Sequence, residues 1–229
     1  MSGDKKQRWV PLESNPEVLN KYVHNLGVPH DWEFVDVYGM DQDLLMMVPR
    51  PVIAVMLLYP ITEQSECPEK KIGMENPAAD GVYYMKQTVG NACGTVAVIH
   101  ALANNTEQIK FEDNKHFKEF LEETSGKEPN QIADILEKDT AMGAAHEDSA
   151  QEGQTEAPSR EDKINTHFIA FVCKNNELYE LDGRKTGPVQ HGSTAPDTLL
   201  EDTIKVVKKF MERDPTQLNF TLMALAKVS

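Results

Sequence analysis

The chain has 229 residues, enough to bury a hydrophobic core in one large domain or two small ones. It carries 23 Lys and Arg residues against 37 Asp and Glu residues, a formal net charge of −14. Nucleic-acid binding needs a basic surface, so this balance argues against that class. The acidic charge is compatible with a basic protein partner, although many cytosolic proteins are acidic without one.

The three cysteines, Cys67, Cys93 and Cys173, lie far apart and form no C-x-x-C pair. We therefore expect a reducing compartment, with neither a disulfide framework nor a zinc site. The N-terminus lacks the apolar segment of a signal peptide, and the longest apolar run, 52–59, is too short to cross a bilayer. We expect a soluble cytoplasmic monomer without metal or cofactor, and leave its presence in the nucleus open.

The first part of the chain alternates helical and extended patterns. Ser14 and Asn15 precede Pro16 as a helix start, and apolar residues then recur at helical spacing until Gly27. Hydrophobic periodicity and turn residues predict the next four segments: a strand at 33–38, a short helix at 41–48, a buried strand at 52–59 and a polar surface loop at 63–80.

The later part predicts further helices and strands in one domain. Two amphipathic helices are predicted at 115–123 and 129–138, followed by a hairpin of strands at 167–173 and 177–182. A long helix, capped by Ser193 or Thr194, then runs to about Met211, and a final strand covers 219–226. No internal repeat and no linker divides the chain. The whole of 1–229 is therefore expected to form a single domain.

Residues 93–103 predict a helix that is apolar on nearly every side, apart from Thr95 and His100. A helix without a polar face has to be buried, so we expect this one to run through the core. Asn91 can cap its start, and Asn104-Asn105 can supply the left-handed residue that ends it.

Cys93 then lies in the first turn, where unpaired N–H groups and the positive end of the helix dipole favour thiolate over thiol. Gly94 removes a side chain beside the sulfur, so that another backbone can approach. The amide of Gln87, in the connecting turn upstream, can reach the same place. Taken alone, a cysteine at a helix start is equally consistent with a buried structural role.

The hairpin supplies possible partners for this cysteine. A turn at 174–175 places His167 directly opposite Asp182, whereas a turn at 175–176 makes them diagonal neighbours about 7–8 Å apart on the same face. Either register lets the carboxylate orient the imidazole. A cysteine and histidine oriented by a carboxylate form the general arrangement of thiol nucleophiles. Taken singly, His167 is also consistent with a structural strand histidine, and Asp182 with a turn residue.

The other candidates fit less well. His100 shares a helix face with Cys93, but the rise between them is about 10 Å, beyond hydrogen-bond reach. Cys173 stands about 20 Å along the strand from His167. The remaining histidines are expected in structural or exposed positions, with His146 in a flexible stretch and His191 in a loop: His24, His30, His116, His146 and His191.

The sequence resembles a known protein family. Three motifs carry the resemblance: Gln87-x5-Cys93 within Asn-Ala-Cys-Gly-Thr, Thr166-His-Phe-Ile-Ala170, and Leu178-Tyr-Glu-Leu-Asp-Gly-Arg-Lys185. They are similar to the motifs of the ubiquitin carboxyl-terminal hydrolases. Matches at 9–17, 48–51, 152–157 and 211–215 extend the resemblance over essentially the full length. It is most similar to the short isozyme-L-three type, and looser at 63–80 and 140–149.

This resemblance implies a papain-like α/β (α+β) fold, with a central, mainly antiparallel sheet flanked by helices and a knotted backbone, which is rare in proteins. It implies hydrolysis after the C-terminal glycine of ubiquitin. Cys93 is then the nucleophile, His167 the general base and later acid, and Asp182 the group that orients His167. The Gln87 side chain and the Cys93 N–H stabilise the oxyanion, each donor contributing about 3 kcal/mol.

The resemblance also places the partner protein. The family's ubiquitin contacts map onto three segments, whose members are Pro11, Leu12, Glu13, Ser14, Asn15 and Pro16; Ala150, Gln151, Glu152, Gly153, Gln154, Thr155, Glu156 and Ala157; and Gln217, Leu218, Asn219, Phe220, Thr221 and Leu222. Ubiquitin, or a close relative of it, is the expected partner. The acidic charge then has a reason, because the ubiquitin tail carries arginines that carboxylates can attract.

The sequence is consistent with three functions. The first is a thiol hydrolase that releases small adducts or short peptides from ubiquitin. The second is a protein that mainly binds and stabilises free ubiquitin, with slow catalysis. The third is a general papain-like protease that cleaves exposed peptides. The motifs favour the first, because every catalytic position holds a competent residue.

The segment 139–163 has no apolar periodicity and lies between a helix and the strand of His167. A structureless loop longer than about 15 residues is usually functional or disordered. Its sequence resembles the crossover loop that spans the active-site cleft in this family. We expect it to admit only a thin chain, to be mobile in the free protein and to become ordered when a ubiquitin tail is bound. A disordered surface linker is the alternative.

Overall fold

The computed structural model describes residues 7–156, 158–162 and 164–229. Its helices and strands, in chain order, are α1 (Pro16–Leu26), β1 (Trp32–Asp36), α2 (Gln42–Leu45), β2 (Val52–Pro60), the 3-10 helix η1 (Pro68–Lys70), β3 (Met74–Glu75), α3 (Cys93–Ala103), α4 (His116–Thr124), α5 (Pro129–Lys138), α6 (Thr140–Ala150), β4 (Thr166–Lys174), β5 (Glu177–Leu181), β6 (Val189–Ser193), α7 (Leu199–Arg213) and β7 (Thr221–Lys227).

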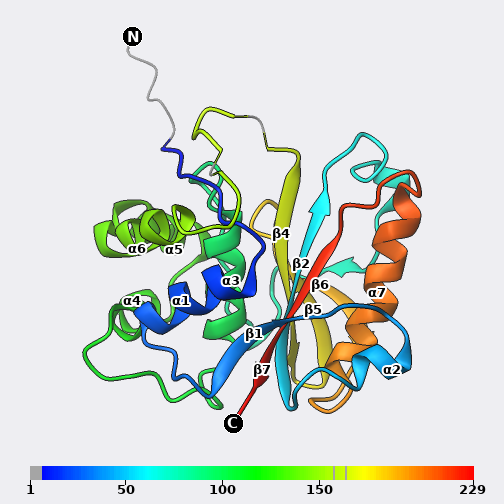
Figure 1. Cartoon of the computed structure of the whole chain (residues 1–229), viewed down its shortest axis with the longest axis horizontal. Coiled ribbons are helices and arrows are strands. Elements are labelled where there is room, and N and C mark those ends of the chain that lie inside the picture. The colour runs from blue at the N-terminus through cyan, green and yellow to red at the C-terminus, as the bar shows by residue number, and fades with distance from the viewer. Residues whose placement is uncertain (1–6, 157, 163) are drawn as a thin grey trace.

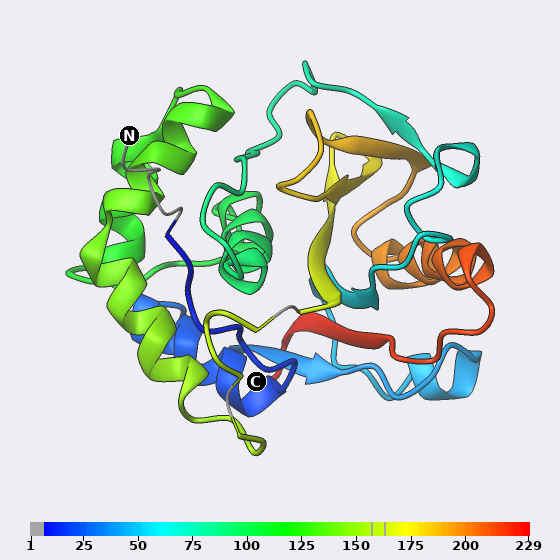
Figure 2. The ribbon, with the colours of Figure 1, turned by 90° about the horizontal axis from the view of Figure 1, so that it is seen from above.

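The strands form one seven-stranded sheet in the order β1-β7-β2-β4-β5-β6-β3, and all the strand pairs in the described chain are antiparallel. Helices α1 and α3 to α6 cover one face, and α2 and α7 cover the other (Figures 1 and 2). The expected antiparallel sheet flanked by helices is confirmed. No helix within the described ranges is long and apolar enough to cross a membrane.

Strand β2 is apolar throughout because both of its faces are buried. Ala54 and Met56 pack into the core beneath α1 and α3, whereas Val55 and Leu57 pack into the core beneath α7. Each fully buried aliphatic side chain of this kind contributes about 1.5–3 kcal/mol. The sheet therefore separates two cores, and the catalytic candidates lie where its strands meet α3.

The first helix is confirmed as the sequence predicts it. The Asn15 side chain accepts a hydrogen bond from the Glu17 N–H at 2.9 Å, and Pro16 occupies the first turn. Gly27 ends the helix with φ 106°, in the left-handed region that favours glycine.

The expectation of a structureless segment over 139–163 is wrong in its first half. Residues 140–150 form α6, which Asp139 caps by accepting hydrogen bonds from the N–H groups of Ala141 and Met142. The buried residues of α6 recur at helical spacing: Met142, His146, Ser149 and Ala150. Two of them are polar, so apolar periodicity could not show the helix.

The expectation that His146 lies in a flexible stretch is wrong for the same reason. The residue is fully buried. One ring nitrogen, Nδ1, lies 2.7 Å from Thr95 Oγ1, and Nε2 lies 2.6 Å from the Val10 carbonyl oxygen. Burial lowers its pKa to about 4, so the ring is neutral near pH 7. His146 is a structural histidine that links α6 to α3 and to the N-terminal segment.

The region before α7 also differs from the prediction. Residues 189–193 form β6, and the helix begins at Leu199 after Thr198, so neither Ser193 nor Thr194 is its cap. Likewise, 63–80 contains η1 and the two-residue strand β3, which pairs with β6. Strand β6 forms by pairing with β5, and β3 by pairing with β6 at the sheet edge; their local sequences do not encode these partners.

The ends of α3 are stabilised differently from the prediction. Asn91 has φ 61° and does not cap the helix; Ala92 precedes Cys93, with no side-chain cap. At the other end Asn104 has φ −83° rather than a left-handed conformation. The side chains of Asn104 and Asn105 instead donate to the carbonyls of the last turn, at 2.8 Å each.

Candidate active site

The β4–β5 hairpin holds the histidine and the carboxylate. Lys174 pairs with Glu177, so the turn is Asn175-Asn176, both with positive φ. This is the diagonal register of the two that the sequence allowed. His167 Nε2 lies 2.7 Å from Asp182 Oδ1, and both side chains are buried. Because Nε2 is used by the carboxylate, Nδ1 is the ring nitrogen left for a thiol.

Cys93 begins α3, as the sequence predicts, and the structure shows that it is partly exposed. The atoms nearest to Gly94 belong to side chains, while the backbone N–H of Phe168 reaches the Cys93 sulfur beside it. A Cβ at Gly94 would lie 3.1 Å from Leu12 Cδ1 and 3.4 Å from Phe168 Cδ2. Phe168 directly follows His167, so this close packing holds the strand bearing the histidine against the first turn of α3.

The electrostatics favour a charged cysteine–histidine pair. Burial disfavours the Cys93 thiolate, but the hydrogen bond and charge of His167, with the Phe168 and Gly94 N–H groups, outweigh it and lower the pKa of the thiol. Burial opposes the imidazolium of His167, yet Asp182 and Cys93 raise its pKa to about 9. The site therefore stabilises thiolate and imidazolium together.

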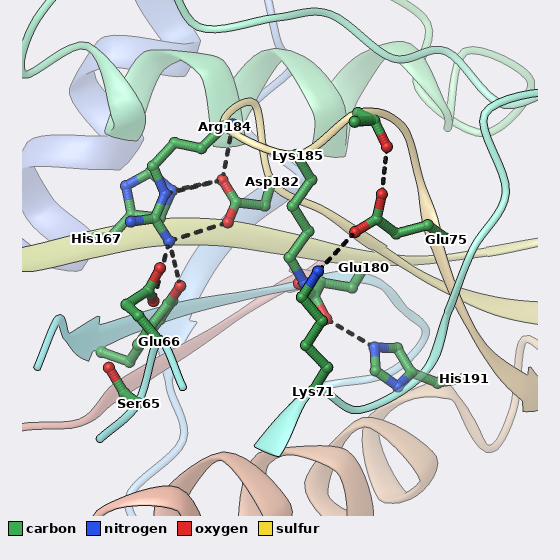
Figure 3. A network of polar contacts seen from close by, with 12 residues as sticks. Ser65, Glu66, Lys71, Glu75, His167, Glu180, Asp182, Arg184, Lys185 and His191 are labelled. Atoms are coloured by element: carbon green, nitrogen blue, oxygen red, sulfur yellow. Dashed lines mark hydrogen bonds and ion pairs between the residues drawn. The ribbon is translucent and has the colours of Figure 1, made fainter. Parts of the chain in front are cut away.

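Asp182 is held by donors on both oxygens (Figure 3). The Arg184 backbone N–H donates to Oδ1 at 2.9 Å, and its guanidinium donates to Oδ2 at 3.1 Å. Burial disfavours the carboxylate, but His167 and Arg184 outweigh this effect and hold the pKa of Asp182 far below its usual range. Arg184 was not singled out in the sequence, although its place two residues after the carboxylate was a signal.

The turn that carries Gln87 is fixed to the turn that follows Asp182. The Gln87 N–H donates to the Gly183 carbonyl at 2.9 Å, and a Cβ at Gly183 would lie 2.9 Å from Gln87 N. In the side chain, Nε2 donates to the Val89 carbonyl at 3.2 Å. The second N–H of Nε2 remains for a ligand.

Two buried aromatic side chains support this turn. His100 Nε2 accepts the Met85 N–H at 3.1 Å, and burial lowers its pKa to about 4. The ring stacks on Tyr84, whose hydroxyl lies 2.8 Å from the Asp182 carbonyl oxygen. His100 is therefore structural, as expected. No group of three or more potential metal-ligating side chains occurs in the described part of the chain.

Two of the three expected ubiquitin-contact segments lie side by side. Glu13 Oε2 accepts hydrogen bonds from the Thr155 N–H at 3.2 Å and its hydroxyl at 3.0 Å, and Gly153 packs against Glu13. Leu12 is buried against Gly94, so it forms a wall of the site rather than free surface. Ala157 lies outside the described residues.

The third segment leads into β7, beside β1. The Val37 N–H donates to the Leu222 carbonyl at 2.9 Å. Leu222 itself is buried, whereas the side chain of Leu218 is 87% exposed. Of this segment, Leu218 thus offers the large apolar contact surface.

The loop from α6 to β4 passes the start of α3. The Asn91 side chain donates to the Arg160 carbonyl at 3.2 Å and to the Trp9 carbonyl at 3.1 Å. Arg8 Nε donates to the same Arg160 oxygen at 2.8 Å. Asn91, predicted as a helix cap, therefore fixes this loop two residues before Cys93. Lys163, at the end of the predicted crossover segment, lies outside the described residues.

The comparison with protein families agrees with the geometry. Residues 9–212 match the model of ubiquitin carboxyl-terminal hydrolase, family 1. The chain belongs to this family. It is 57% identical to a ubiquitin carboxyl-terminal hydrolase of Aplysia californica, over 92% of this chain and 98% of the relative. It is 46% identical to human isozyme L1 of this enzyme, over 96% and 98% of the two chains.

The fold has a solved counterpart. The catalytic domain of Trichinella spiralis UCH37, in a crystal structure with ubiquitin vinyl methyl ester, aligns with a TM-score of 0.79. The alignment covers 96% of each chain at 22% sequence identity. This likeness confirms the fold of the family.

Proposed function

We propose that this chain is a cysteine-type deubiquitinating enzyme that cleaves after the C-terminal glycine of ubiquitin and acts as a cytoplasmic monomer. The observation that carries the proposal is the His167–Asp182 pair at 2.7 Å, beside a cysteine whose pKa is lowered. Family membership supplies the substrate class.

The reaction starts with attack of the Cys93 thiolate on the glycine carbonyl carbon. The C–N, C–O or C–S bond to the adduct breaks, and the imidazolium of His167 gives its proton to the leaving group. A water molecule then attacks the thioester while His167 takes its proton. Ubiquitin leaves with a free carboxylate, and Cys93 is regenerated. Asp182 stabilises the imidazolium and sets its orientation throughout.

Two donors support the oxyanion in both steps. The first N–H groups of α3 have no partner within the helix, and that of Cys93 is at the reacting sulfur. The free N–H of Gln87 is the second donor. Loss of one such donor costs about 3 kcal/mol in comparable sites. This role requires the amide of Gln87 to be held in place, and its hydrogen bond to Val89 limits its motion.

The binding surface extends from the α1 entry to the start of β7. Glu13, Ser14 and Gln154 share a groove with Asp36 and Tyr38 of the β1 end. The groove is rich in carboxylates, which attract the arginines of the ubiquitin tail. The contacts proposed for Leu12 and Leu222 are made by their backbone or after rearrangement, because both side chains are buried.

The loop between α6 and β4 acts as a filter for the leaving group. It is bound to Glu13 at Thr155 and to Asn91 at Arg160, so it crosses near the nucleophile. A closed loop passes a thin chain and excludes a folded protein. We expect its hydrogen bonds to open in the free protein and to tighten when the ubiquitin tail is bound.

The test is the variant Cys93→Ser. Turnover of a small ubiquitin ester should be abolished, whereas ubiquitin affinity should remain, because the binding surface extends far beyond the sulfur. The matched variant Cys173→Ser, on β4 away from the site, should retain full turnover. Full activity of Cys93→Ser excludes the proposed nucleophile. If the wild-type protein does not bind ubiquitin, the proposed substrate is excluded.

A further inference from the structure

A second pocket lies on the far side of Asp182 from the reaction. It has a volume of about 380 Å³, and its walls come from the segment after β2, the β3 region and the turn after β5. Asp182 and Arg184 form part of its lining, but Cys93, His167 and Gln87 do not. The pocket is therefore separate from the place where the ubiquitin glycine reacts.

Most charges around this pocket are already paired. Arg184 contacts Asp182 and lies 3.5 Å from Glu66, while Lys185 is paired with the buried Glu180 (Figure 3). Among the basic residues labelled in Figure 3, Lys71 has the longest ion pair. Its Nζ lies 3.7 Å from Glu75, and its side chain is 73% exposed.

Arg213, the last residue of α7, is different. It lines the pocket and is only 7% exposed, yet it forms no ion pair within the described ranges. Its guanidinium lies 4.1 Å from the centre of the Phe210 ring. One N–H group reaches the Ser65 carbonyl at the long distance of 3.5 Å, and Nε has no partner among the residues that the structure describes. A buried cation with so few acceptors is costly to the fold.

Arg213 has few acceptors in the protein and lines the pocket. Phe210 covers the face of the guanidinium, so only its edge is available for hydrogen bonds. The residue is almost fully buried and lines the pocket, so an oxygen ligand in the pocket would meet this edge. An edge of this kind matches two oxygens of a carboxylate or phosphate.

We propose that this pocket binds a small anion with several oxygens, held by Arg213 and assisted by Lys71. Its volume is in the range of small-molecule sites. The anion supplies the acceptors that Arg213 lacks. It also connects the end of α7 with the segment after β2 and with the turn that carries Arg184, so it stabilises the wall behind Asp182. This site does not depend on the proposed reaction.

Calorimetric titration of the full chain tests the site. Inorganic phosphate and citrate are titrated separately, each against sodium chloride at equal ionic strength. At least one should bind saturably, with a dissociation constant in the millimolar range or tighter. Tighter binding of phosphate indicates a phosphate-bearing ligand, and tighter binding of citrate indicates a carboxylate-bearing one.

Variants assign the binding to this pocket. Arg213→Gln should weaken the preferred anion about tenfold or more. If that variant does not fold, Lys71→Gln serves instead, because its exposed side chain can be changed safely; it should weaken binding about threefold. Lys205→Gln, an exposed α7 lysine outside the lining, should bind as the wild type does. Absence of saturable binding, or unchanged affinity in the pocket variants, overturns the proposal.

Discussion

The variant Asp182→Asn removes the charge opposite His167 while keeping the side-chain shape. Asp182 Oδ1 accepts from His167 and from the Arg184 N–H, and Oδ2 accepts from the Arg184 guanidinium. In either orientation of the asparagine, its NH₂ group must face a donor of Arg184 or of His167. If it faces His167, it stabilises the wrong imidazole tautomer.

The size of the effect follows from the imidazole. The rise in the His167 pKa from 6.5 to about 9 corresponds to about 3 kcal/mol in favour of the imidazolium, shared between Asp182 and Cys93. Loss of the larger part of this energy lowers the rate about 10²-fold. Misorientation of the ring adds to it, up to the factor of about 10⁴ known for such substitutions in serine proteases.

Single-turnover hydrolysis of a small ubiquitin ester at saturating concentration measures this loss. Ubiquitin affinity and the midpoint of thermal unfolding, measured in parallel, separate a catalytic effect from a folding one. Asp113→Asn is the matched control: it changes an exposed carboxylate that accepts a hydrogen bond from Lys118, and it should leave the rate unchanged. Near-normal turnover of Asp182→Asn refutes the role of the carboxylate.

Three further predictions concern the same site. The rate should rise with pH as the Cys93 thiolate forms and fall above about pH 9 as the His167 imidazolium loses its proton. Folding raises the pKa of His167, so this residue also contributes to the free energy of unfolding. That contribution is present below about pH 6.5 and is lost as pH rises through about 9. A rate that keeps rising beyond pH 10 contradicts the ion pair. Gly183→Ala should reduce turnover more than ubiquitin affinity, because its Cβ would lie 2.9 Å from backbone and Cβ atoms of Gln87; equal losses in both quantities oppose this. Lengthening the loop between Thr155 and Arg160 with Gly and Ser should permit cleavage of folded di-ubiquitin while small-ester hydrolysis changes little, and wild-type protein that cleaves both equally well has no such filter.

Local signals were sufficient for parts of the site. Asn15, Pro16 and Gly27 defined α1, and the apolar surface of α3 showed that it is buried. The hairpin was also readable, because consecutive asparagines tolerate the positive φ of its turn. Parity along two paired strands then placed His167 and Asp182 on one face without knowledge of the rest of the fold.

The failures involve contacts between residues far apart in sequence. Helix α6 was missed because the partner that makes His146 a core residue is Thr95, 51 positions away. Asn91 was taken for a cap because its acceptors, Trp9 and Arg160, come from two distant segments. Strand β6 forms by pairing with β5, and the two-residue β3 by pairing with β6 at the sheet edge. The backbone knot, implied only by family resemblance, stays a prediction.

Ubiquitin that carries an electrophile at its C-terminus tests the role of Cys93 most directly. The wild-type protein is treated with one equivalent, digested and mapped by mass spectrometry. A single adduct should form on Cys93, with Cys67 and Cys173 unmodified, and His167→Ala should be labelled more slowly. Labelling of Cys67 or Cys173 in place of Cys93, or equal labelling of all three, contradicts Cys93 as the nucleophile.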